Sequence, residues 1–104
     1  MELIAHDKNN SNVVKESKTD YILNHEQRHF DLSFIYAMKF VDELKKQPTL
    51  TLDDIDIIYN KIFNEWTTCQ NQYDMETKNS VNKEMQTIWD EKISGQLNKL
   101  KLNN

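Results

Sequence analysis

Glycine and proline are scarce in this chain, and their scarcity limits the folds that it can adopt. The 104 residues include one glycine, Gly95, and one proline, Pro48. Folds built from many short strands need these residue types for the tight turns between strands. A chain with so few of them is suited to long helices joined by few tight turns. We therefore expect a mainly α-helical protein.

Length and composition indicate a single domain that spans residues 1–104. The chain is 38% hydrophobic and 29% charged, which is enough for one core but small for a complete enzyme cleft. Its net charge is -4 and its basic residues alternate with acidic ones, a pattern that argues against nucleic-acid binding. No apolar run approaches the ~20 residues of a membrane-spanning helix. The single cysteine, Cys69, excludes an internal disulfide and is expected to be a small apolar residue on a helix.

The first of the expected helices covers residues 20–46. Its apolar residues recur mostly at three- and four-residue steps and occupy more than one side, which indicates a central helix. Pro48 ends it, because proline lacks a backbone N–H and disfavours helix in the residue before it. Upstream, short apolar pieces at residues 3–6 and 13–14 flank a turn-prone Asp-Lys-Asn-Asn cluster. We expect a short β-hairpin or a frayed arm there.

Two further helices are expected in the second half of the chain. Thr51 precedes an acidic first turn that suits the positive end of a helix dipole, and apolar residues then recur at helical steps as far as Cys69. The pattern fades after Cys69, and residues 73–79 are predicted to be a polar connector. Ser80 is the expected N-cap of a last helix that reaches Leu100. The predicted fold class is therefore a three-helix domain with a short N-terminal hairpin.

The first expected helix contains the sequence His25-Glu26-Gln27-Arg28-His29, an H-E-x-x-H motif. Residues four apart lie on the same face of a helix, so His25 and His29 can bind one metal ion. Glu26 can then act as the general base toward a water that the metal activates. The alternative is a pair of surface histidines whose spacing arises by chance. The motif predicts a zinc site and hydrolase chemistry.

Two longer stretches carry a family resemblance. Residues 21–40, YILNHEQRHFDLSFIYAMKF, are similar to the core block of a bacterial family of unknown function that is regarded as exported, zincin-like metallopeptidases. Residues 73–93, YDMETKNSVNKEMQTIWDEKI, resemble a later block of the same family. The resemblance covers roughly residues 6 to 97. It implies a zincin-like active-site helix, zinc as cofactor, a peptide or protein substrate, and an exported or periplasmic location, although no apolar signal-peptide core follows Met1.

The third metal ligand is where this chain departs from the family pattern. His25 and His29 match the family's ligands and Glu26 its base, but Asn79 stands where the family has a histidine. A neutral amide oxygen is a poor zinc ligand. Other side chains could replace it, and we rank Asp74 and Glu76 ahead of a histidine from the N-terminal arm. The further alternatives are His6, Glu84 and Asn79 itself, through a water.

A second departure is the small amount of β structure that the sequence predicts. Zincins commonly hold the substrate as an added strand at a sheet edge, and only the short apolar pieces before residue 15 could form one here. The chain is then either a fragment that lacks upstream β structure or a shortened relative. Three functions stay open: a zinc metallopeptidase, an inactive zincin-like domain with a structural or partner-binding role, and a plain three-helix interaction module.

Overall fold

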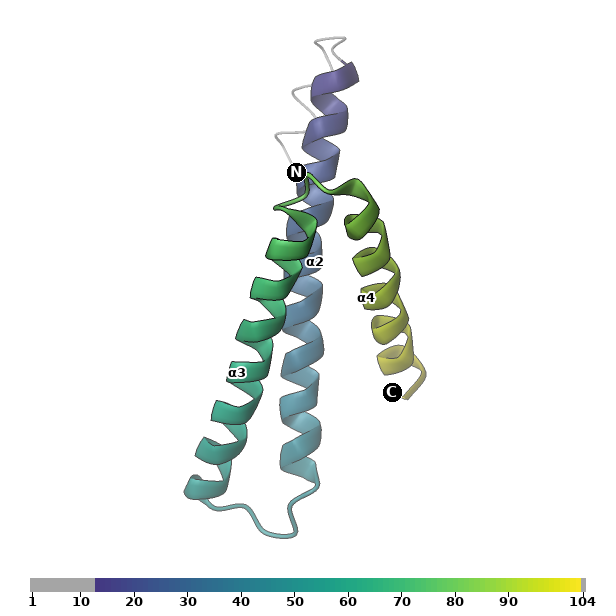
Figure 1. The fold of residues 1–104 in the computed structure, drawn as a ribbon. Coiled ribbons are helices and arrows are strands. Elements are labelled where there is room, and N and C mark those ends of the chain that lie inside the picture. Colours follow the sequence, from purple (N-terminus) through teal and green to yellow (C-terminus); the bar gives the residue numbers. More distant parts are fainter. Residues whose placement is uncertain (1–12, 104) are drawn as a thin grey trace.

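The computed structural model describes residues 13–103, which form three α-helices (Figure 1). Helix α2 spans Val13–Lys45, α3 spans Leu52–Thr77 and α4 spans Lys83–Asn103. Helix α3 runs back along α2, and α4 turns again to run beside both (Figure 1). The described residues contain no strand. The expectation of a mainly α-helical protein is confirmed.

Part of the segment that was expected to form an N-terminal hairpin is helical. Val13 and Val14 belong to α2, so they do not supply the second strand. The first expected strand, residues 3–6, lies outside the described residues. The described part of α2 begins at Val13 rather than at Asp20. The lysine and glutamate residues that follow the two valines are good helix formers, which is consistent with this earlier start.

The start of α3 follows the sequence prediction closely. Thr51 is the N-cap: its hydroxyl accepts a hydrogen bond from the Asp54 backbone N–H at 3.0 Å, and the Asp54 carboxylate accepts one from the Thr51 N–H at 3.1 Å. This reciprocal capping box satisfies two N–H groups that the helix leaves unpaired. The loop that contains Pro48 separates this cap from the end of α2. The acidic first turn therefore marks the helix start, as expected.

The predicted polar connector at residues 73–79 is wrong. Helix α3 continues to Thr77, and Tyr73 and Thr77 are both fully buried. The polar residues that suggested a loop instead form hydrogen bonds inside the protein, which periodicity of apolar residues does not reveal. The chain reverses only after Thr77, where the next three residues have positive φ angles of 50°, 55° and 86°. These residues are Lys78, Asn79 and Ser80.

The N-cap of α4 also differs from the prediction. The Met85 backbone N–H donates to the Asn82 side-chain oxygen at 3.0 Å, so Asn82 rather than Ser80 caps this helix. Asparagine and serine are comparable N-caps. Ser80 is the last of the three residues with positive φ, so it belongs to the chain reversal and Asn82 takes the cap position. The core that joins the helices consists of Leu32, Ile35, Tyr73, Trp89 and Ile93, and Cys69 packs partly buried against it. Among residues 13–103, no helix has the length and apolar character to cross a membrane.

Candidate metal centre

His25 and His29 lie one turn apart on α2 and face α3. The His25 side chain is 3% exposed and the His29 side chain is 24% exposed. Their ring centroids are 5.0 Å apart and the rings are nearly perpendicular. The spacing of the motif therefore places both imidazoles on one face, as the sequence predicted.

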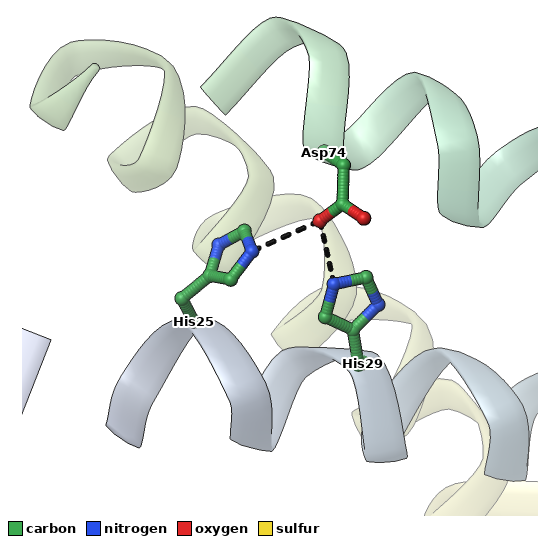
Figure 2. Close-up of side chains that lie close together, drawn as sticks. All are labelled: His25, His29 and Asp74. Atoms are coloured by element: carbon green, nitrogen blue, oxygen red, sulfur yellow. Dashed lines mark hydrogen bonds and ion pairs between the residues drawn. The ribbon is translucent and has the colours of Figure 1, made fainter. Parts of the chain in front are cut away.

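Asp74 on α3 completes a group of three possible metal ligands. Its Oδ1 atom lies 3.0 Å from His25 Nε2 and 2.6 Å from His29 Nε2 (Figure 2). One ligand atom from each of the three side chains lies within 4.8 Å of the others. Figure 2 shows the two rings and the carboxylate pointing toward a common point between the helices. Two helices from distant parts of the chain thus contribute to one site.

The spacing of these atoms can be compared with that of zinc ligands. Ligand atoms about 2.0 Å from a tetrahedral zinc ion lie about 3.3 Å from one another. The Asp74 oxygen lies 3.0 and 2.6 Å from the two Nε2 atoms, somewhat closer than this spacing, and all three ligand atoms lie within 4.8 Å of one another. Two imidazoles and one carboxylate also form a donor set that zinc uses in catalytic sites, with a fourth position left for water. The residues present therefore fit the metal.

The far side of each imidazole contacts a glutamine. His25 Nδ1 lies 2.9 Å from Gln86 Oε1, and His29 Nδ1 contacts Gln70 Oε1. Gln86 comes from α4 and is 1% exposed, whereas Gln70 comes from α3. All three helices therefore contribute to the surroundings of the site, although α4 supplies no ligand.

Tyr73 packs against the face of the His25 ring. The two rings are stacked with their centroids 4.6 Å apart, and the Tyr73 hydroxyl donates a 2.9 Å hydrogen bond to the His25 backbone carbonyl. Burial raises the pKa of Tyr73 to about 12, so the phenol keeps its proton at neutral pH. Tyr73 fixes the backbone of α2 at His25 and limits how the ring can turn.

Glu26 lies at the solvent side of the motif. Its side chain is exposed and contributes to the wall of an open pocket of about 330 Å³ that His29 and Phe30 also line. Ser33, Trp66 and Gln70 form the rest of that wall. The Glu26 carboxylate is therefore open to water, and the pocket that it lines borders the side of His29 where Gln70 contacts Nδ1.

The other ligands that the sequence suggested lie elsewhere or outside the described residues. The Glu76 carboxylate accepts hydrogen bonds from Trp89 Nε1 at 2.9 Å and from Gln72 at 2.8 Å. Asn79 and Glu84 are exposed, and Asn79 lies in the reversal after α3. Neither these two nor Glu76 belongs to the group of possible ligands found among the described residues. His6 lies outside that range.

Sequence reasoning missed the two glutamines. Gln70 lies four residues before Asp74 on α3, and Gln86 lies four residues before Asp90 on α4. A polar residue one turn from a ligand, on the same helix face, is the signal that could have identified Gln70. Gln86 lies at a matched position of the family block over residues 73–93, but its contact with His25 depends on how α4 packs against α2.

A comparison of the chain with protein-family models, with curated proteins and with solved structures finds no match in any of the three. The resemblance to zincin-like metallopeptidases therefore stays a prediction.

Proposed function

We propose that this protein is a zinc-dependent hydrolase of the metallopeptidase type, with His25, His29 and Asp74 as the metal ligands. One observation carries the proposal: two imidazole Nε2 atoms lie within 3.0 Å of the same carboxylate oxygen, from helices that meet at that point. A chance pair of surface histidines has no reason to share a partner or to have one ring buried. We also propose that the chain is related to the zincin-like metallopeptidases that its sequence resembles.

Each side chain has a role that follows from its position. A zinc ion at these ligands would supply a Lewis acid that lowers the pKa of a bound water toward about 7. The exposed Glu26 carboxylate takes the proton from water and returns it to the leaving amine. Tyr73 holds the α2 backbone at His25 through its hydroxyl.

A structural zinc site without catalysis is the second candidate. It is favoured by the lack of any strand among residues 13–103, since zincins commonly bind a substrate as an added strand. A zinc ion between α2 and α3 would then link the two helices and contribute its binding energy to folding. Both candidates use the same ligands, and they differ in whether Glu26 matters.

The test compares wild-type protein with Glu26→Gln after zinc loading. Elemental analysis gives the zinc content, and cleavage of a fluorogenic peptide library gives the activity. We expect about one zinc per chain in both proteins and at least a ~100-fold loss of cleavage in Glu26→Gln, because a general base contributes that much or more. Glu91→Gln, a change to another exposed glutamate, serves as the control and should keep full activity.

Each other outcome has a defined meaning. Wild-type protein without bound zinc would contradict both candidates. Bound zinc with no cleavage of any peptide in the library would favour the structural site. Cleavage that survives Glu26→Gln would remove Glu26 from the proposed chemistry.

A further inference from the structure

The amide of Gln86 can take only one orientation. Its Nε2 atom lies 2.9 Å from Asp90 Oδ1 and 2.7 Å from the Tyr73 hydroxyl oxygen. The carboxylate accepts hydrogen bonds and does not donate, and the Tyr73 proton is directed to the His25 carbonyl. Both positions therefore need the NH₂ group. The Gln86 oxygen is left facing His25.

The amide of Gln70 is oriented in the same way. Its Nε2 atom donates to the His29 backbone carbonyl at 3.1 Å and to the Ser33 hydroxyl oxygen at 3.2 Å. The Ser33 proton is directed to the same carbonyl at 3.1 Å, and Trp66 Nε1 donates to Ser33 at 3.0 Å. The amide oxygen of Gln70 therefore faces His29. Two unrelated networks give the two histidines the same kind of partner.

An oxygen acceptor at Nδ1 fixes where an imidazole carries its proton. Each ring must place a hydrogen on Nδ1 to bond the glutamine, and in the neutral ring this leaves Nε2 with a free lone pair. Both lone pairs then face the Asp74 carboxylate, which cannot donate to them. A cation between the three groups satisfies all of them at once. Without the glutamines, a hydrogen on Nε2 would bond Asp74 instead and would close the site.

We infer that Gln86 and Gln70 are positioning residues of the metal centre, whose amide oxygens keep the proton of each imidazole on Nδ1 and leave Nε2 available to the metal. This inference rests on the metal ligands proposed above. Asp90 belongs to the same arrangement, because it also accepts hydrogen bonds from Arg28 Nε at 3.0 Å and from Asn24 at 3.0 Å. Helix α4 thus sets metal affinity without contributing a ligand.

The first test measures zinc affinity by competition with a chelating dye. Partners that orient a ligating histidine typically change metal affinity 10- to 100-fold. We expect a loss in that range for Gln86→Met and for Gln70→Met. Gln70→Glu keeps an acceptor at His29 Nδ1 but loses the amide donor to the His29 carbonyl, so it should lose less zinc affinity than Gln70→Met without matching wild type. Gln72→Met removes an exposed glutamine of α3 and is the matched control.

The second test separates positioning from a general loss of structure. Two-dimensional ¹⁵N–¹H spectra of the histidine rings in metal-free protein report which ring nitrogen carries the hydrogen. We expect Nδ1–H for both rings in wild type. In Gln86→Met, His25 should change to Nε2–H while His29 stays unchanged. A variant that is merely destabilised would not alter one ring selectively.

The outcomes distinguish this inference from the proposed function. Zinc binding that is as tight in both methionine variants as in the Gln72→Met control would overturn the inference and leave the proposed ligands intact. If wild-type protein binds no zinc, the proposed function fails, and the ring spectra alone decide whether the glutamines set the tautomers. Spectra that show Nε2–H in wild type would overturn the inference in either case.

Discussion

The two ends of the α2–α3 helix pair differ in what they bury. At the end where α4 packs, the buried polar side chains are His25, Thr77 and Gln86, and each makes hydrogen bonds inside the protein. At the loop end, beyond the reach of α4 (Figure 1), the buried side chains are the aliphatic Ile58 and Ile62, and the aromatic Tyr59 and Phe63 stay 51% and 44% exposed. The end with three helices buries polar side chains, whereas the end with two buries aliphatic ones.

This difference indicates that the polar end is shaped by something other than stability. Buried polar groups stabilise a protein little even when fully hydrogen-bonded, and they are costly when one partner is lost. An apolar interior would hold three helices together equally well. Proteins keep such networks mainly where they position a functional group. The contrast between the two ends therefore supports a binding or catalytic role for the three-helix end.

The largest effect is expected when a residue of the three-helix core is truncated, and a residue at the loop end provides the comparison. Leu32 is 1% exposed and belongs to the core that joins all three helices. We expect Leu32→Ala to lower the free energy of unfolding by about 2–5 kcal/mol, because it leaves a cavity. Phe63→Ala at the loop end should lower the free energy of unfolding clearly less, because Phe63 is 44% exposed. Urea unfolding of metal-free protein measures both, and equal losses would mean that the two ends are packed alike.

A smaller effect is expected from one hydroxyl group. Tyr73→Phe removes the donor to the His25 carbonyl and the acceptor of the Gln86 amide. Two buried polar groups lose a partner, so we expect a loss of about 1–3 kcal/mol. Tyr59→Phe at the loop end should change stability by less than about 0.5 kcal/mol. The same urea experiment applies, and a harmless Tyr73→Phe would show that the polar network is loosely held.

Alkaline pH should affect the polar end through Tyr73. Burial raises the pKa of Tyr73 to about 12, whereas an unfolded chain has a tyrosine pKa of about 10. Between pH ~10 and ~12 the unfolded chain loses the Tyr73 proton while the folded protein keeps it. The contribution of Tyr73 to the free energy of unfolding is therefore complete below pH ~10 and is lost as the pH rises toward ~12. Unfolding measured from pH 9 to 11 should show the decline, and it should be shallower in Tyr73→Phe. An identical slope in both proteins would argue against burial of this phenol.

The smallest effect is expected at Asn79, the position where the family pattern has a histidine. Asn79 is exposed in the reversal after α3, and its backbone has a positive φ of 55°. Asn79→His should therefore leave zinc affinity unchanged. Asp74→Ala, five residues earlier, should weaken zinc binding more than any other change outside the two histidines. A large gain in affinity from Asn79→His would mean that the reversal can fold back onto the metal.

The sequence predicted the helices better than it predicted their extent. The start of α3 was predictable because Thr51 and Asp54 form a local capping box. The motif placed His25 and His29 correctly, since residues four apart share a helix face whatever surrounds them. The end of α3 was not predictable, because Tyr73 and Thr77 are buried by contacts with distant residues and look like loop residues in their own neighbourhood.

The metal ligands could likewise be predicted only in part from the local sequence. Asp74 and Glu76 were equal alternatives in a presumed connector, and helical geometry separates them: Asp74 faces the histidines, and two residues later Glu76 faces Trp89. Once residues 73–77 are helical, these two side chains point in directions about 200° apart. The contact of Gln86 with His25 depends on the packing of α4 against α2, which the local sequence does not reveal.

Anomalous X-ray diffraction at the zinc edge from crystals of the zinc-loaded protein tests the central claim most directly. We predict one anomalous peak per chain, with His25 Nε2, His29 Nε2 and an Asp74 carboxylate oxygen each about 2.0–2.2 Å from the ion. A peak held instead by Glu76 or Asn79, or the lack of any peak between α2 and α3, would contradict the proposed centre.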